Sequence, residues 1–485
     1  MDFKALMQKD FQLPSLPPFR TYRASLGRAL LFLLLPNVVF WLFSWHLHLA
    51  RPLINLDYFI ACALILLPLP FYLNHILAGI AFFGVAIFDI LMLTMQLFPF
   101  MDIGAMMYLA PFILEGPKQY LILTILAVIA LGLTFYLLYR FAKKQAPKIV
   151  LGLAAFVGLI GYQLRWITYH QVEAEYFAVD SYYVFNSQYS LYNEHYENPF
   201  VSAARNQPEL GAGQEEYASK RFKQPYSDKV MLVVVESWGV AREESVQRDI
   251  LKAIYDQADN LEFIEEGFFD FSGATLNGEL RELCQMRVLK GGYALGKIDD
   301  AVYQNCLPNK LKALGYKTMG MHGASSLLYD RLYWYKKAGM DTQVFVEHVP
   351  EVPKCHAFNG ACDTGLMDII AKEFEKNQNN KFFFYWLTLT NHYPYSQTDL
   401  KNSRLDCEKH NLFAGDICHN FRLHTQFFDN LGELIKRPEM AGVEVILVGD
   451  HMPPIDTRDV PIHKNVRWND VSWLHFKVKE QSALP

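Results

Sequence analysis

The chain has 485 residues, of which 52% are hydrophobic, 15% aromatic and 20% charged. This composition excludes a disordered or collagen-like protein, and the length predicts two or three domains. Its 45 Lys and Arg residues stand against 50 Asp and Glu residues, which gives a net charge of −5. We therefore expect no nucleic-acid partner, because nucleic-acid-binding proteins normally carry a strong basic bias.

The first third of the chain is typical of a membrane domain. Residues 29–50 contain no Asp, Glu, Lys or Arg and are long enough to span a bilayer. Further apolar runs cover residues 58–73, 76–100, 119–139 and 150–164. A signal peptide is the alternative for the first run, but four more runs follow it. We therefore predict a five-helix transmembrane domain over residues 1–166.

Basic residues on two segments predict the orientation of this domain. They precede the first run and separate the fourth run from the fifth: Lys4, Lys9, Arg20, Arg23, Arg28, Arg140, Lys143, Lys144 and Lys148. With five spans both segments lie on the same side, and the positive-inside rule places them in the cytoplasm. Everything after Trp166 is then expected outside.

Six of the seven cysteines follow the membrane domain. An even number of cysteines in an oxidising compartment predicts three disulfides. Fifteen pairings are possible, and we expect neighbours in the sequence to pair: Cys284 with Cys306, Cys355 with Cys362, and Cys407 with Cys418. Six reduced and buried thiols are the alternative.

Residues 167–227 are rich in Tyr, Asn and Glu, with apolar residues at irregular spacing. We interpret this segment as a linker of interfacial helices, because amphipathic aromatic residues favour the level of the lipid headgroups.

From residue 228 to 485, apolar runs alternate with helical stretches, which predicts an α/β domain with a mostly parallel central sheet. Four predicted strands end at Glu236, at His322, at Asn391-His392 and at Asp450-His451. The carboxyl ends of strands are where ligands bind in open α/β sheets. The sequence therefore predicts one shared site at this edge.

Thr275 follows small residues and precedes good helix formers, so we expect it at a helix N-terminus. Unpaired amides and the helix dipole favour negative charge there, which would suit a nucleophile that attacks a phosphoryl group. The alternative is a threonine that only caps the helix.

The chain resembles the lipoteichoic acid synthase and phosphoethanolamine transferase group of the alkaline phosphatase (sulfatase) superfamily. Glu236, Thr275, Asn391-His392-Tyr-Pro-Tyr and Gly449-Asp450-His451 occur in the same order as in that group. Five spans followed by an exported catalytic domain is also the layout of the group. The resemblance implies an alkaline-phosphatase-like domain over residues 228–485.

The resemblance also implies roles for single residues. It assigns one divalent metal, zinc or manganese, to Glu236, Thr275, Asp450 and His451. Thr275 is also the implied nucleophile, and His392 is the second implied catalytic residue. The implied substrate-binding residues are His322, Tyr329, Arg331 and His392. For two of them the alternatives are ordinary packing of Tyr329 and a surface charge at Arg331.

One departure from the group is Met452, which stands where relatives have glycine after Asp-His. Few histidines follow it, which puts a second metal in doubt.

The implied reaction transfers phosphoethanolamine from the phospholipid phosphatidylethanolamine to a sugar of lipopolysaccharide through a phospho-threonine intermediate. Six exported cysteines and the absence of a wall-anchoring signal favour a multi-pass protein of the bacterial inner membrane with its catalytic domain in the periplasm. The expected partners are a phospholipid donor, a glycolipid or glycan acceptor, and the membrane.

Other functions stay open at this point. They include a phosphoglycerol transferase that acts on a periplasmic or surface glycan, a metal-dependent phosphodiesterase, and a membrane receptor with a degenerate site. A sulfatase is disfavoured, because the stretch Cys306-Leu-Pro308-Asn-Lys310 ends in lysine where the sulfatase signature has arginine.

Overall fold

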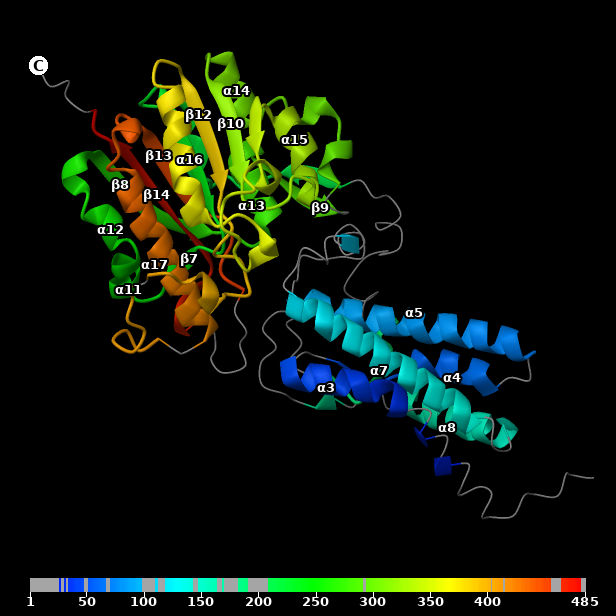
Figure 1. Ribbon diagram of the computed structural model, residues 1–485. Coiled ribbons are helices and arrows are strands. Elements are labelled where there is room, and N and C mark those ends of the chain that lie inside the picture. The colour runs from blue at the N-terminus through cyan, green and yellow to red at the C-terminus, as the bar shows by residue number, and fades with distance from the viewer. Residues whose placement is uncertain are drawn as a thin grey trace, which may run out of the picture. The chain divides into compact units, whose positions relative to one another are not determined.

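The structure is a computed structural model of the chain (Figure 1). It describes residues 26–27, 30–31, 34–47, 51–66, 70–97, 110–111, 118–142, 147–163, 168–169, 182–190, 208–290, 294–402, 404–412, 415–454 and 464–480. The chain divides into two compact units. The helical unit comprises Met1–Pro99 and Thr124–Glu197, and the α/β unit comprises Phe100–Leu123 and Asn198–Pro485. The boundaries expected at residues 166 and 227 stay predictions.

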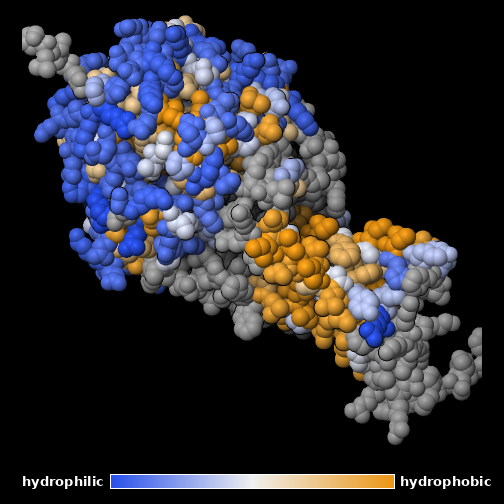
Figure 2. Space-filling model, viewed as in Figure 1, coloured by the Kyte–Doolittle hydropathy of each residue, from blue (hydrophilic) through white to orange (hydrophobic). Residues whose placement is uncertain are grey.

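Each of the five predicted apolar runs overlaps a helix. These helices are α3 (Val38–Leu47), α4 (Tyr58–Leu66), α5 (Phe71–Leu97), α7 (Lys118–Ala142) and α8 (Pro147–Gln163). Apolar side chains cover much of the outside of these helices (Figure 2). Within the described residues, one helix, Tyr72–Thr94, is long and apolar enough to cross a membrane. Five membrane crossings therefore stay a prediction.

A buried ion pair lies inside the helical unit. Nη2 of Arg51 lies 2.6 Å from Oδ2 of Asp89, and the two side chains are 1% and 0% exposed. Asn37 accepts a hydrogen bond from Arg51 at 2.7 Å, and Gln188 donates one to Asp89 at 3.0 Å. These contacts satisfy both charges within an apolar helical unit, as buried ions require.

Residues 182–190 are held on the helical unit by short strands and by one carboxylate. Strand β4 (Phe185–Asn186) pairs in parallel with β1 (Ile54–Asn55). Asp57 accepts hydrogen bonds from the Ser187 hydroxyl at 2.5 Å and from the Tyr189 amide at 3.1 Å. We expected interfacial helices between residues 167 and 227. The described parts of that stretch hold helical residues 188–190, short strands and one 3-10 helix: β2 (Thr168–Tyr169), β3 (Tyr182–Tyr183), β4, β5 (Glu209–Ala212) and η3 (Ala218–Lys223). The interfacial helices stay a prediction.

The α/β unit is built on a mixed sheet of eight strands among its described residues. In spatial order these are β11 (Thr342–Val344), β10 (Lys317–His322), β12 (Phe382–Leu387), β6 (Lys229–Val235), β13 (Glu444–Gly449), β14 (Val466–Val478) and β7 (Gly239–Ala241), with β8 (Leu261–Asp270) also paired to β14. The first five are parallel neighbours. Strand β14 is antiparallel to β13, β7 and β8, so the sheet expected to be mostly parallel is mixed.

Helices cover both faces of this sheet (Figure 1). Met231, Val233 and Val235 of β6 belong to one core cluster, and the residues between them belong to the other. The first cluster contains residues of α11 (Glu244–Ile250), α12 (Lys252–Tyr255), α16 (Asp363–Lys376) and α17 (Asp416–Leu434). The second contains residues of α13 (Thr275–Cys284), α14 (Leu307–Ala313) and α15 (Arg331–Ala338). A strand buried on both faces is continuously apolar, which is the pattern that predicted β6.

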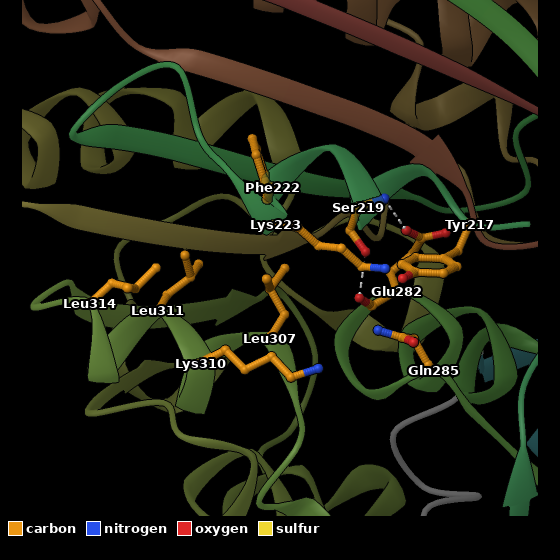
Figure 3. A pocket seen from close by; sticks show the side chains of 10 residues that line it. All are labelled: Tyr217, Ser219, Phe222, Lys223, Glu282, Gln285, Leu307, Lys310, Leu311 and Leu314. Carbon is orange, nitrogen blue, oxygen red and sulfur yellow. Dashed lines mark hydrogen bonds between the residues drawn. The ribbon is translucent and has the colours of Figure 1, made fainter. Parts of the chain in front are cut away.

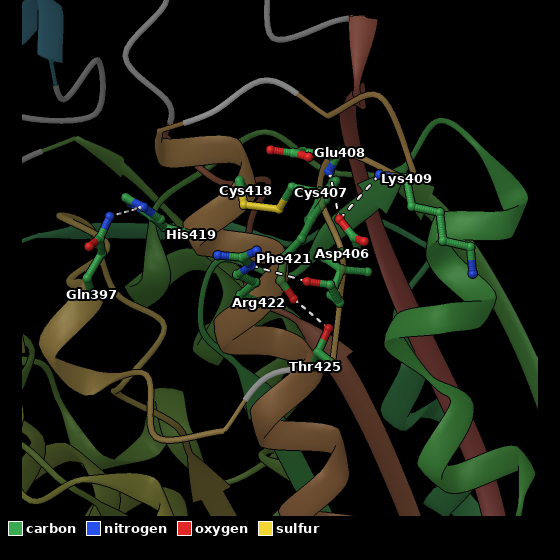
Figure 4. The surroundings of a disulfide bond; sticks show 11 residues. Gln397, Asp406, Cys407, Glu408, Lys409, Cys418, His419, Phe421, Arg422 and Thr425 are labelled. Atoms are coloured by element: carbon green, nitrogen blue, oxygen red, sulfur yellow. Dashed lines mark hydrogen bonds between the residues drawn. A yellow bond between two sulfur atoms is a disulfide. The ribbon is translucent and has the colours of Figure 1, made fainter.

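Two of the three predicted disulfides are confirmed. Cys284 is bonded to Cys306, and Cys407 is bonded to Cys418 at the start of α17 (Figure 4). The third prediction is wrong, because Cys355 and Cys362 are free thiols. They lie in hydrogen-bonding contact, and this contact and burial raise the pKa of the Cys355 thiol. The Cys355 thiol also donates to the carbonyl of Gly360 at 3.5 Å.

The ion pair of the helical unit generates a prediction. Asp89→Ala would leave Arg51 buried without a counter-charge, which costs about 3–5 kcal/mol. We expect a clearly lower melting temperature for the purified full chain in detergent. Thr94→Ala is the matched control, because Thr94 lies on the same helix and its hydroxyl donates only within that helix, to Ile90. Equal melting temperatures for the two variants would contradict a stabilising role of the pair.

Candidate active site

The site is assembled at the carboxyl edge of the central sheet. Glu236 follows β6, and Asp450 and His451 follow β13. These two strands are parallel neighbours and are paired up to their last residues, so Glu236 and Asp450 lie side by side. Thr275 is the first residue of α13, which begins directly beside them.

A glycine lets α13 approach the end of β13. A Cβ atom at Gly278 would lie 2.7 Å from the carbonyl oxygen of Asp450 and 2.8 Å from its Cα atom. Side chains do not tolerate such distances, so glycine is required at this point of the helix. The close approach sets the position of Thr275, one turn earlier, against the two carboxylates.

Four predicted residues converge within a few ångströms. Oγ1 of Thr275 lies 3.3 Å from Oε2 of Glu236 and 3.4 Å from Nε2 of His451. The same His451 nitrogen lies 3.5 Å from Oε1 of Glu236 and 3.4 Å from Oδ2 of Asp450. Ligand atoms of Glu236, Asp450 and His451 all lie within 4.8 Å of one another. All four residues are buried.

The electrostatics of these residues fit a cation. Burial and the charge of Asp450 raise the pKa of Glu236 well above its usual value. Oδ2 of Asp450 is buried and, among the described residues, has no hydrogen-bond partner. A divalent ion between the carboxylates would remove both penalties. Two carboxylates, an imidazole and a hydroxyl are a donor set suited to zinc or manganese.

Two further histidines lie at the same edge. His322 ends β10 and is 3% exposed, and its Nδ1 lies 3.0 Å from the carbonyl oxygen of Leu387. Burial lowers the pKa of His322 well below its usual value and that of His392 to about 4. The ring of Phe358 packs edge-on against His392 at 4.7 Å. Both imidazoles are therefore neutral near pH 7.

Arg331 lies in a second buried ion pair, with Glu279 of α13. Its Nε and Nη2 donate to Oε2 of Glu279 at 3.0 and 2.7 Å, and Arg331 is 1% exposed. The hydroxyls of Tyr335 and Tyr385 donate to the other oxygen of Glu279. Arg331 is thus no surface charge, and its predicted contact with a phosphate stays a prediction. The guanidinium carbon also lies 4.8 Å from the ring centroid of Tyr329, which is half-buried.

Arg281 connects α13 to the end of β13. Its guanidinium donates to the carbonyls of Gly449 at 2.7 Å and Asp450 at 3.3 Å. Glu282 balances its charge at 2.7 Å. Glu282 also accepts a hydrogen bond from the backbone amide of Ser219 at 2.8 Å. Both residues line a small cavity among η3, α13 and α14 (Figure 3). No predicted site residue lines that cavity.

Our sequence analysis missed Glu279, Arg281 and Glu282. One signal was available, because Thr275, Glu279 and Glu282 stand at helical positions i, i+4 and i+7 and so share one face. Charged residues at core-facing positions must be paired. The sequence does not reveal their partners, since these come from distant parts of the chain.

Comparisons with known proteins agree with this architecture. Residues 285–472 match the Sulfatase family model. This segment includes His322, His392, Asp450 and His451, whereas Glu236 and Thr275 precede it. The comparison with curated proteins found no match.

Several solved structures are similar to part of the chain. The lipoteichoic acid synthase LtaP from Listeria monocytogenes is 16% identical, with a TM-score of 0.38, and the match covers 53% of this chain and 66% of LtaP. The C-terminal periplasmic domain of EcEptC from Escherichia coli is 14% identical, with a TM-score of 0.35 and coverages of 56% and 78%. The Streptococcus pyogenes phosphoglycerol transferase GacH is 13% identical, with a TM-score of 0.37 and coverages of 55% and 77%.

The match of residues 285–472 to the Sulfatase family model agrees with the resemblance to the alkaline phosphatase (sulfatase) superfamily that we predicted from the sequence. The similar structures thus include a lipoteichoic acid synthase and a phosphoglycerol transferase.

The ion pair of the α/β unit generates a second prediction. Arg331→Met would leave Glu279 buried without its counter-charge, at a cost of about 3–5 kcal/mol. We expect a marked fall in the melting temperature of the purified full chain. Combining it with Glu279→Gln should recover part of the loss, because no unpaired charge is then buried. Arg437→Met is the control, since Arg437 is 37% exposed in its pair with Asp368. A melting temperature that matches this control would exclude the ion pair as a stabilising element.

Proposed function

We propose that this protein is a membrane-bound, metal-dependent transferase. It moves phosphoethanolamine from phosphatidylethanolamine to a sugar of lipopolysaccharide through a phospho-threonine intermediate. The observation that carries the proposal is the position of the Thr275 hydroxyl at a helix N-terminus, 3.3 Å from Glu236 and 3.4 Å from His451. A hydroxyl needs such activation before it can attack phosphorus.

Glu236, Asp450, His451 and Thr275 would hold the divalent cation, zinc or manganese. When bound, such an ion lowers the pKa of a coordinated hydroxyl and offsets charge on a phosphoryl group. The raised pKa of Glu236 supports this assignment, as does Oδ2 of Asp450, which has no hydrogen-bond partner among the described residues. The amides at the start of α13 favour the negative charge that develops beside Thr275.

The reaction has two half-steps. Oγ1 of Thr275 attacks phosphorus and gives up its proton to a histidine, the bond from phosphorus to the diacylglycerol oxygen breaks, and that oxygen takes the proton from the histidine. A hydroxyl of the acceptor sugar then attacks the phosphorus of phospho-threonine and gives up its proton as Thr275 is regenerated. His392 or His322 would carry these protons, because both imidazoles are neutral near pH 7.

We propose His322, Tyr329, Arg331 and His392 as residues of the substrate pocket. The two histidines and Arg331 interact electrostatically, which supports a common location. Arg331 keeps its charge beside Glu279, since the pair is joined by two hydrogen bonds. A bound phosphate would therefore meet a guanidinium that is already oriented.

We place the enzyme in the bacterial inner membrane, with its catalytic unit in the periplasm. Five apolar helices support a multi-pass protein, and two disulfides in the α/β unit support an oxidising compartment. A phospholipid donor in the same membrane and a glycolipid or glycan acceptor are the proposed partners.

The covalent step is testable without an acceptor. We expect the purified full chain, incubated with vesicles of phosphatidylethanolamine, to gain the mass of phosphoethanolamine on the peptide that contains Thr275. Thr275→Ala should prevent this labelling and lower transfer by at least about 10³-fold. Thr275→Ser, which keeps a hydroxyl, should retain measurable labelling.

The same experiment separates the alternatives. Labelling only from phosphatidylglycerol would identify a phosphoglycerol transferase. Release of the head group into water at equal rates with and without lipopolysaccharide would identify a phosphodiesterase. Full activity of Thr275→Ala would exclude the covalent mechanism.

A further inference from the structure

Ser237, the residue after Glu236, holds both carboxylates of the candidate metal centre. Its hydroxyl donates to Oε1 of Glu236 at 3.0 Å, and its backbone amide donates to Oδ1 of Asp450 at 2.7 Å. One oxygen of each carboxylate is thereby fixed. Of the other two oxygens, Oε2 of Glu236 lies 3.3 Å from Oγ1 of Thr275, and Oδ2 of Asp450 lies 3.4 Å from Nε2 of His451.

The backbone of Ser237 is held in an unusual conformation. Its φ angle is 57°, in the left-handed region that residues with a Cβ atom rarely adopt, and Ser237 is fully buried. Such a conformation persists only where the surroundings enforce it. Here helix α17 supplies the constraint, because Nε2 of His424 lies 2.9 Å and Nδ2 of Asn420 lies 3.4 Å from the Ser237 carbonyl oxygen.

His424 joins the two sides of the site. The Ser237 carbonyl can only accept a hydrogen bond, so Nε2 of His424 carries the hydrogen. Nδ1 of His424 lies 2.7 Å from the side-chain Nδ2 of Asn391, which can only donate, so Nδ1 accepts. A neutral imidazole satisfies both contacts. Asn391 directly precedes His392, and Ser237 directly follows Glu236, so one ring links the carboxylate side to the histidine side.

We propose that Ser237 and His424 are positioning residues of the metal centre. Ser237 holds Oε1 of Glu236 and Oδ1 of Asp450 by hydrogen bonds and leaves Oε2 and Oδ2 without a bond to it, and His424 holds Ser237 in the conformation that permits this. Groups that orient metal ligands typically contribute 10–100-fold in metal affinity. The inference rests on the proposed function in one respect, because it requires that the site binds a divalent cation. It does not depend on which group is transferred.

The test is the Zn²⁺ affinity of the full chain, measured by chelator competition without substrate. Ser237→Gly removes the hydroxyl, keeps the amide and accepts the left-handed backbone. We expect it to weaken Zn²⁺ binding about 10-fold. His424→Leu should weaken it by a similar factor, whereas His424→Gln, which offers one donor and one acceptor, should recover most of the affinity.

The matched control is Thr425→Val on the same helix. Thr425 is buried, and its hydroxyl donates within α17 to the carbonyl of Phe421 at 2.8 Å (Figure 4). Zn²⁺ affinity should not change in this variant. The melting temperature of each metal-free variant separates a general loss of stability from a loss of metal binding.

The inference is overturned if Ser237→Gly binds Zn²⁺ as tightly as the unmodified chain, or if the unmodified chain binds no divalent cation. It is also overturned if His424→Gln and His424→Leu have the same affinity while both are folded. An unmodified chain that binds Zn²⁺ but transfers no head group would remove the proposed function and leave this inference standing.

Discussion

Two carboxylates, those of Glu236 and Asp450, are held side by side in a buried space because the strands that precede them are paired up to their ends. Like charges in such surroundings repel unless a proton or a cation lies between them. The register of β6 against β13 leaves neither residue free to move away. Positive charge beside Thr275, the first residue of α13, would therefore stabilise the folded α/β unit.

Helix α13 fixes Thr275 beside these two carboxylates. Gly278 lets the helix pack against the backbone of Asp450. Arg281 donates hydrogen bonds to the carbonyls of Gly449, at the end of β13, and Asp450, directly after it. Glu279 accepts hydrogen bonds from Arg331 of α15 and Tyr385 of β12. Each of its buried charges is paired, so the helix gains a fixed position without leaving an uncompensated ion. Thr275, the first residue of this helix, therefore has a fixed position relative to Glu236 and His451.

The helical unit shows the same principle in an apolar setting. Arg51 and Asp89 neutralise each other, and Gln188 joins the pair from a segment about a hundred residues away in the sequence. The segment that follows the apolar helices is thus fixed to them by hydrogen bonds from residues 182–190.

The sequence by itself determined the apolar helices, the four parallel strands β6, β10, β12 and β13, and the residues at their ends. Its signals are local, because a strand buried on both faces is continuously apolar and a membrane segment must be. Glu236, Thr275, Asp450 and His451 could be named for this reason, and because their order resembles that of a known superfamily. Only the tertiary structure decided what holds them. Ser237, Arg281 and His424 take their roles from partners far away in the chain, and no local pattern encodes such contacts. The same reason explains the wrong disulfide: closeness in sequence brings the Cys355 and Cys362 thiols together, but whether they are joined depends on the geometry around them.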